Sequence, residues 1–218
     1  MEEIASSTSF RLMSPQDLEA ILEIERLSFS LCWGEKHFLV ALEKNSSMHC
    51  VVMERQLKLL AYFLVEFEGG RTHLLNLAVH PDERRKGHAT HCLKVIDQLA
   101  LKNLDVCKSR NVRLEATTPR RLLSAYPPPA WPGEAGSSGE SDLLEDPALP
   151  RDDLVDPDVV EIYLEVEERN LPAQLLYRKA GYRAVQILRN FYPQLGEDAY
   201  RMVRRIHRLG PGAREEGQ

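Results

Sequence analysis

The stretch Leu74-Leu75-Asn76-Leu77-Ala78-Val79-His80-Pro81-Asp82-Glu83-Arg84-Arg85-Lys86-Gly87-His88-Ala89-Thr90 decides the fold of this 218-residue chain. Its apolar first part closes at His80-Pro81, where proline removes an amide donor and keeps the preceding residue extended, so this part predicts a buried strand. Beyond Gly87, apolar side chains recur at three- and four-residue spacing, which is typical of a helix packed on a sheet. These side chains are Ala89, Leu93, Ile96 and Ala100.

The turn between this strand and this helix holds three consecutive cations, Arg84, Arg85 and Lys86, followed by Gly87. Such a turn can direct several backbone N–H groups and the positive end of a helix at one point, and a phosphate is the usual occupant of that geometry. A solvated basic turn has the same composition, because runs of charge usually lie at the surface. The turn alone therefore leaves both interpretations open.

The composition is that of a globular protein, with 43% hydrophobic and 28% charged residues and a formal net charge of −5. No apolar run reaches the ~20 residues that span a bilayer, and the acidic start 1–4 is unlike a signal peptide. We therefore expect a cytoplasmic protein without a membrane segment. The net charge argues against direct nucleic-acid binding, although the basic patches 84–86 and 201–208 could meet phosphates.

The cysteines form no C-x-x-C pair and lie near no histidine pattern that would suit tetrahedral zinc. We expect reduced, partly buried thiols and no metal. The four residues are Cys32, Cys50, Cys92 and Cys107.

Hydrophobic periodicity predicts an alternation of strands and helices along the chain. The expected strands are 10–12, 48–54, 57–67, 72–79, 161–166, 182–189 and 198–206, with a hairpin at 190–196 and a further short strand at 112–116. Ser14 is expected to cap a first helix with Pro15 at its first position, and Asn170 to cap a helix over 172–180 that stops at Gly181. A second helix is expected through 38–42, and the helix after Gly87 is expected to end at Lys102 or to reach Arg110.

The segment 117–158 interrupts this pattern with prolines, glycines, serines and scattered acids. Such a composition buries too little apolar surface to offset the ordering of the chain, so most of it is expected to be a disordered insertion. The alternative is that part of it caps a substrate cleft through Arg120, Arg121, Tyr126 or Trp131. We expect one domain over 8–207, followed by a flexible tail over 208–218.

Four blocks of sequence carry a resemblance to a known family. Arg84-Arg85-Lys86-Gly87-His88-Ala89 fits the Arg/Gln-x-x-Gly-x-Gly/Ala signature of the GCN5-related N-acetyltransferases (GNAT), and three later blocks resemble the RimI-type enzymes of that superfamily. The later blocks are 164–170, 176–182 and 189–193. The resemblance covers 10–206 apart from the insertion, and it implies an α/β acyltransferase fold with a mixed central sheet flanked by helices.

The resemblance implies two catalytic residues. Glu165, at the end of a strand, matches the family's proton acceptor, and Tyr177, in Leu-Tyr-x-x-x-Gly-Tyr, matches its proton donor. A solvated carboxylate and an ordinary packed tyrosine are the alternatives. Glu115 competes with Glu165, but only Glu165 is followed by Asn170 and Tyr177 at the family spacing.

The resemblance also implies how acetyl-coenzyme A is bound. The strand residues Leu77, Ala78 and Val79 would meet the pantetheine arm, and Asn170 would touch the coenzyme beyond the thioester. The pyrophosphate would be held by Arg85, Lys86, Gly87, His88, Ala89 and Thr90. His88 and Ala89 replace the commoner leucine and glycine of the signature. Trp33 and Tyr192, with Phe29 and Leu31, lie where the resemblance places peptide-facing loops, although core packing is an alternative for Trp33.

The implied function is transfer of an acetyl group from acetyl-coenzyme A to the N-terminal amine of a protein. The favoured N-terminal residue is alanine, and the protein would be one such as a ribosomal protein. An α-amino group titrates near ~7.7–8.0 and a lysine near ~10.4, so an N-terminal substrate needs only mild help from a base. Two alternatives stay open. One is an acetyltransferase for lysine or small amines, and the other is a non-catalytic coenzyme-binding module that docks a partner.

Overall fold

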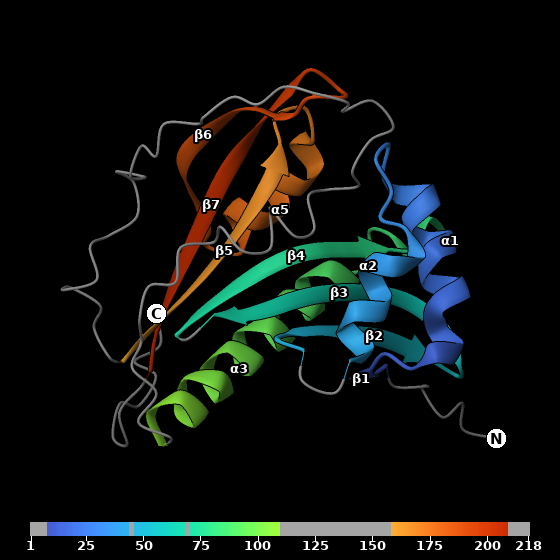
Figure 1. The fold of residues 1–218 in the computed structure, drawn as a ribbon, viewed down its shortest axis with the longest axis horizontal. Helices are drawn as coiled ribbons and strands as arrows, with labels where there is room; N and C mark the ends of the chain where they lie inside the picture. Colours follow the sequence, from blue (N-terminus) through green and yellow to red (C-terminus); the bar gives the residue numbers. More distant parts are fainter. Residues whose placement is uncertain (1–7, 44–45, 69, 110–157, 209–218) are drawn as a thin grey trace, which may run out of the picture. The chain divides into compact units, whose positions relative to one another are not determined.

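The computed structural model describes residues 8–43, 46–68, 70–109 and 158–208, with 105–109 described by their backbone alone. Seven strands form a mixed sheet in the order β1-β2-β3-β4-β5-β7-β6 (Figure 1). The strands are β1 (Ser9–Leu12), β2 (Met48–Arg55), β3 (Lys58–Glu68), β4 (Arg71–Val79), β5 (Val159–Glu167), β6 (Arg183–Tyr192) and β7 (Glu197–His207). The helices are α1 (Leu18–Ser28), α2 (Glu35–Leu39), α3 (His88–Ser109) and α5 (Leu171–Lys179), with 3₁₀ turns at Pro15–Asp17, Val40–Leu42 and Pro81–Glu83.

The chain divides into two compact units. The described part of the first unit ends at Glu66 and resumes over Leu74–Cys92. The second unit holds Phe67–His73, the rest of α3 from Leu93, and the described residues from 158 onward. Helix α3 and strand β4 therefore each contribute to both units.

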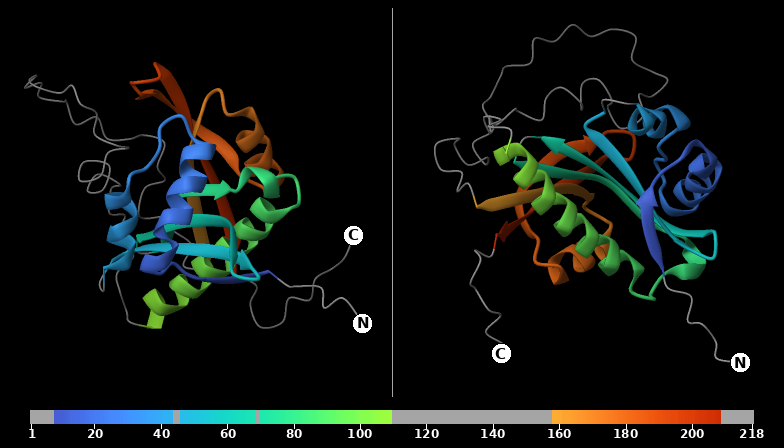
Figure 2. Two further views of the ribbon diagram at one scale, coloured as in Figure 1. Left: turned by 90° about the vertical axis from the view of Figure 1, so that its right-hand side faces the viewer. Right: turned by 90° about the horizontal axis from the view of Figure 1, so that it is seen from below.

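The first unit is built on the antiparallel strands β1, β2 and β3 and on the second half of β4. Helices α1 and α2 cover one face of these strands (Figure 2). Alternation along the strands supplies that face with apolar side chains, because successive residues of a strand point to opposite sides. The resulting core contains Met13, Ile21, Ile24, Phe38, Met48, Cys50, Val52, Tyr62, Leu64 and Ala78, all less than a tenth exposed.

The start of α1 differs from the prediction in one detail. Ser14 does precede the helix and Pro15 does open it, but the first turn is a 3₁₀ turn, and the Ser14 hydroxyl donates to Asp17 Oδ2 (2.7 Å). Arg11 donates to both oxygens of the Asp17 carboxylate (2.6 and 2.8 Å). Because Asp17 also accepts the Ser14 backbone N–H (2.7 Å), the carboxylate rather than the serine closes this turn.

The second unit holds the antiparallel strands β5, β7 and β6 and helix α5. The beginning of β4 pairs with β5 in parallel, with Arg71 opposite Glu161 and His73 opposite Tyr163. Asn170 caps α5 by accepting the Ala173 N–H (3.2 Å), as predicted. Gly181 takes the predicted left-handed conformation after the helix (φ 90°).

Two boundaries correct the sequence prediction. Strand β6 continues to Tyr192, where a hairpin was expected from Asn190, because Tyr192 still pairs with Glu197 across the two strands. Asn190 sits at an irregularity with a φ of 50°, and its N–H donates to Asp198 (2.7 Å). Leu57 lies in the turn before β3 rather than in the strand, with a φ of 64°.

Of the remaining predictions, some are confirmed and others concern residues that the structure does not describe. The longer of the two ends considered for α3 is confirmed, since the helix reaches Ser109. The strand expected at 112–116, Glu115, and the insertion 117–158 apart from its last residue lie outside the described residues, as does the tail from 209 onward. Within the described residues, no helix is both long enough and apolar enough to cross a membrane.

Candidate active site

The basic turn of the first unit has a backbone shaped by two residues in the left-handed region. After the 3₁₀ turn Pro81–Glu83, Arg84 is extended, Arg85 has a φ of 63° and Gly87 a φ of 85°, and α3 begins at His88. Left-handed backbone is readily adopted only by glycine. A Cβ placed on Gly87 would meet no atom within 4 Å. The turn thus combines an exposed glycine with the first N–H groups of a 22-residue helix, which is the arrangement that accommodates a phosphate.

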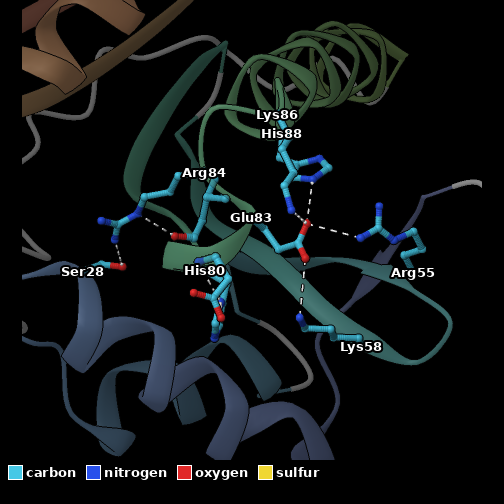
Figure 3. A network of polar contacts seen from close by, with 10 residues as sticks. Ser28, Arg55, Lys58, His80, Glu83, Arg84, Lys86 and His88 are labelled. Carbon is cyan, nitrogen blue, oxygen red and sulfur yellow. Dashed lines mark hydrogen bonds and ion pairs between the residues drawn. The ribbon is translucent and has the colours of Figure 1, made fainter.

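The side chains of this turn are held by internal contacts (Figure 3). Arg84 donates from Nε to the Val79 carbonyl (3.1 Å) and from Nη2 to Ser28 Oγ (2.9 Å). Lys86 Nζ donates to Glu83 Oε2 (3.1 Å), and His88 Nε2 lies 3.5 Å from the same oxygen. The side chains of Arg84 and Lys86 are therefore held by hydrogen bonds, and His88 lies beside the Glu83 carboxylate.

The Glu83 carboxylate accepts most of the charged contacts around this turn, and only 6% of its side chain is exposed. Besides Lys86 and His88, its carboxylate is paired with Arg55 (3.3 Å) and Lys58 (3.5 Å), which flank the β2–β3 turn (Figure 3). Among the described residues, Arg85 makes no ion pair. The turn therefore offers a coenzyme its backbone N–H groups and the Arg85 guanidinium, while the other predicted cations are engaged.

The other predicted coenzyme residues of this unit flank the turn. On β4, Ala78 is buried in the core, while Leu77 and Val79 are half-buried. Thr90 is exposed in the first turn of α3 and Ala89 is half-buried. The residues present fit a pyrophosphate at the turn, because an open glycine and free helix N–H groups meet there.

In the second unit, Glu165 on β5 lies between two basic side chains. Its Oε2 is 2.7 Å from His73 Nε2 on β4, and its Oε1 accepts from Arg201 Nε on β7 (3.0 Å). All three side chains are less than a tenth exposed. Burial by itself raises the pKa of Glu165, but the charges and hydrogen bonds of His73 and Arg201 outweigh it and lower the pKa to about 2. Glu165 is therefore a buried carboxylate that stays ionised.

His73 is fixed from a second direction by Tyr163. The two rings are stacked with their centroids 4.3 Å apart, and the Tyr163 hydroxyl donates to Glu68 Oε2 (2.8 Å). Because a carboxylate only accepts hydrogen bonds, the proton between His73 and Glu165 belongs to Nε2 of the imidazole. Nδ1 is the ring nitrogen of His73 that does not face Glu165.

Tyr177 and Tyr192 belong to the same unit as Glu165. Tyr177 on α5 is buried against Tyr182 in an edge-to-face contact (5.7 Å between centroids), and burial raises its pKa, so its hydroxyl keeps its proton at neutral pH. Tyr192 is half-buried, and burial followed by the charges of Glu167 and Glu165 raises its pKa. Trp33, the other residue assigned to a peptide, lies in the first unit, half-buried, with its ring 5.3 Å from that of His37.

His73 and Arg201 were not among the predicted site residues. Both contact Glu165, yet His73 looks like an isolated polar residue of its strand and Arg201 looks like one member of the basic patch 201–208. The pairing of the strands is what brings both residues to Glu165. Arg201 stands directly opposite Glu165 in the β5–β7 register. His73 stands opposite Tyr163, which lies two residues before Glu165 and on the same side of β5. Only a correct strand order reveals these neighbours.

Comparison with known proteins bears on the family and the fold. Residues 18–119 match the model of the acetyltransferase (GNAT) family, and the arrangement of strands and helices is the GNAT acyltransferase fold. The predicted fold class and the predicted resemblance are thereby confirmed.

Particular relatives are N-terminal acetyltransferases. The chain is 22% identical over 194 residues to a Bacillus subtilis protein provisionally named ribosomal protein bS18-alanine N-acetyltransferase, covering 89% of this chain and 93% of that protein. It is 52% identical over 43 residues to an N-alpha-acetyltransferase of Sulfurisphaera tokodaii, a match that spans 20% of this chain and 25% of the relative. The crystal structure of the Escherichia coli ribosomal-protein-S18-alanine N-acetyltransferase superimposes with a TM-score of 0.58 at 20% identity, covering 95% of this chain and 99% of that one.

Proposed function

We propose that this protein transfers the acetyl group of acetyl-coenzyme A to the N-terminal amine of a protein. The observation that carries the proposal is the buried pair of Glu165 and His73, 2.7 Å apart, in a chain that matches the acetyltransferase (GNAT) family. The names of the Bacillus, Sulfurisphaera and Escherichia relatives support an N-terminal amine as the acceptor.

The reaction requires an acceptor amine that has lost its proton. Glu165 is held ionised by Arg201 and His73, and the His73 ring has a second nitrogen, Nδ1, that does not face Glu165. We assign the proton transfer to the pair: His73 accepts the proton at Nδ1, and the ionised Glu165 stabilises the imidazolium through Nε2–H. This proposal keeps Glu165 in the catalytic machinery, where the resemblance implies a proton acceptor, but assigns the accepting atom to its partner His73.

The leaving thiolate requires a proton. We assign that role to Tyr177, because its burial keeps the hydroxyl protonated at neutral pH. Because a phenol is a weaker acid than a thiol and burial weakens Tyr177 further, the hydroxyl is assigned to donate while negative charge develops on the sulfur, not to a free thiolate.

The coenzyme, when bound, supplies an acetyl thioester. We assign its pyrophosphate to the turn of the first unit, with the backbone of Gly87, His88 and Ala89 and the side chain of Arg85 as the principal donors. Asn170 uses its Oδ1 to cap α5, which leaves its Nδ2 for the coenzyme. The half-buried Trp33 and Tyr192 are assigned to the peptide.

The substrate that we favour is a protein beginning with alanine, such as a ribosomal protein, since two of the relatives are named for that activity. Such an enzyme would meet its substrate and acetyl-coenzyme A in the cytoplasm. Lysine acetylation is the competing activity.

A panel of peptides tests the proposal. Mass spectrometry would follow acetylation of peptides that begin with alanine, serine or methionine, and of a peptide with a blocked N-terminus and an internal lysine. We expect acetylation of the free N-termini, alanine above the others, and its loss with Glu165→Gln. Acetylation of the blocked peptide alone would replace the proposal with a lysine acetyltransferase, and coenzyme binding without any acetylation would replace it with a binding module.

A further inference from the structure

The buried carboxylate of Glu25 on α1 has no part in the chemistry described above. We propose that Glu25 is a positioning residue that fixes Trp33, and the segment 29–34 around it, against β3 and β4, and thereby sets the affinity for the peptide. The assignment of Trp33 to the peptide rests on the proposed function.

The contacts of Glu25 join four parts of the first unit. Its Oε1 accepts the backbone N–H of Trp33 (2.8 Å), and both of its oxygens lie 3.2 Å from Asn76 Nδ2 on β4. The hydroxyl of Tyr62 on β3 donates to Oε2. Glu25 itself is 0% exposed. One carboxylate thus ties the loop after α1 to two central strands.

The buried charge of Glu25 is unfavourable for the stability of the fold. Every group that donates to Glu25 is neutral, and among the described residues no cation makes an ion pair with it. Burial raises the pKa of Glu25, and the hydrogen bonds from Tyr62, Trp33 and Asn76 lower it by less. A buried carboxylate without a counter-ion contributes poorly to stability compared with an apolar side chain of similar size. Its neighbours Ile21 and Ile24 on α1 show that this face otherwise packs as an apolar core.

The other contacts of the segment that contains Trp33 are made by its neighbours in the chain and by packing of Phe29 and Trp33 on the core. Phe29 N–H donates to the Glu25 carbonyl (3.0 Å) at the end of α1, and the Cys32 thiol donates to the Phe29 carbonyl (3.1 Å). The Trp33 ring leans on Phe38, 6.1 Å between centroids, and remains half-buried. Glu25 therefore fixes the backbone of Trp33, while the ring keeps an exposed part that can meet a ligand.

The same carboxylate reaches the strand assigned to the coenzyme. Asn76 directly precedes Leu77, Ala78 and Val79 on β4. If Glu25 acts through Trp33, its loss affects the peptide more than the coenzyme, because the β4 backbone is also held by its strand pairing. A merely structural role would instead reduce stability without this selectivity.

The experiment uses the full chain with Trp131→Phe, which leaves Trp33 as the only tryptophan. In this background, Glu25→Leu and Glu25→Asp are compared with Ile24→Ala, a neighbour on α1 that is equally buried and has no hydrogen bond to Trp33. Acrylamide quenching of Trp33, the KM for the peptide, kcat and the Kd for acetyl-coenzyme A are measured. Glu25→Leu removes both acceptor oxygens. Glu25→Asp keeps the charge but shortens the reach, and it stands in if Glu25→Leu does not fold.

We expect the Glu25 variants to raise the peptide KM about tenfold, the effect of losing one buried hydrogen bond, with a higher quenching constant and an unchanged Kd for the coenzyme. Ile24→Ala is expected to lower stability while quenching and peptide KM stay at the parent values. Equal quenching in the parent and the Glu25 variants, or the same KM change with Ile24→Ala, would overturn the proposal. If the parent acetylates no peptide, the proposed function fails, and the quenching result still decides whether Glu25 positions Trp33.

Discussion

The imidazole of His73 lies 2.7 Å from the carboxylate of Glu165, and both side chains are less than a tenth exposed. They come from strands β4 and β5, 92 residues apart in the sequence. Since catalysis is assigned to the pair, its two members should act as a unit.

A double-mutant cycle tests this unit. His73→Phe keeps a ring against Tyr163 and removes both nitrogens, while Glu165→Gln keeps the shape and removes the charge. We expect each to lower kcat about 10²–10⁴-fold, the range of general-base catalysis, and the double variant to lose little more. Steady-state kinetics measure the cycle, and isothermal titration with acetyl-coenzyme A shows whether coenzyme binding is retained. Fully additive losses would mean that the two residues act independently.

The low pKa of Glu165 predicts a loss of stability in acid. Its folded pKa of about 2 lies below the ordinary value of 4.5, so its ion pairs stabilise the fold above pH ~4.5, and this contribution is lost as the pH falls toward 2. The shift corresponds to about 3 kcal/mol. Urea unfolding at pH 7 and at pH 3 should therefore show a smaller pH effect for Glu165→Gln than for the parent. At pH 7 the variant should be less stable, because the charged contacts of Arg201 and His73 with the Glu165 carboxylate are lost.

Gly87→Trp should abolish most of the affinity for acetyl-coenzyme A. A side chain at this position is strained by the φ of 85° and occupies the open space in front of the turn, where the phosphates are assigned. We expect the Kd from titration calorimetry to rise at least about 10²-fold, the cost of losing two or more charge-assisted hydrogen bonds. Gly196→Trp is the matched control, since Gly196 has a φ of 62° and equally open surroundings in the second unit. An unchanged Kd for Gly87→Trp would remove the pyrophosphate from this turn.

Tyr177→Phe should lower kcat about 10²-fold or more, because the leaving thiolate loses its proton donor, and it should leave coenzyme binding intact. Tyr182→Phe provides the comparison. Tyr182 is also buried, its ring touches that of Tyr177, and among the described residues its hydroxyl has no hydrogen-bond partner. Stopped-flow measurement of thiol release would compare the two. Similar rates in both variants would assign Tyr177 to packing alone.

The sequence predicted the local elements well because each depends on neighbours in the chain. Pro81 ends β4, Asn170 caps α5, and Gly181 takes the left-handed position, all as expected. The pairings across the sheet were beyond this kind of reasoning. Asn190 looked like the start of a turn, yet β6 continues to Tyr192 because its partner strand supplies the hydrogen bonds.

For the candidate site, too, the local motifs were predictable from the sequence and the contacts between strands were not. Glu165, Tyr177 and the turn around Gly87 were predicted from short motifs. The partners that determine what Glu165 can do, His73 and Arg201, come from other strands, and the low pKa that follows from them could not be inferred from β5 alone. The ion pairs of Glu83 with Arg55 and Lys58 could not be predicted either, because these two residues are distant from Glu83 in the sequence.

The parallel contact between β4 and β5 extends over three residue pairs, from Arg71 opposite Glu161 to His73 opposite Tyr163. The first of these pairs, Arg71 and Glu161, forms a salt bridge. Arg205 on β7 forms a second salt bridge with the same Glu161 carboxylate (3.0 Å). A slip of one residue would turn His73 to the other side of the sheet, away from Glu165. The ion pairs of Glu161 therefore help to keep β4 and β5 in register, so the contact between His73 and Glu165 depends on an ion pair four residues before Glu165 on β5.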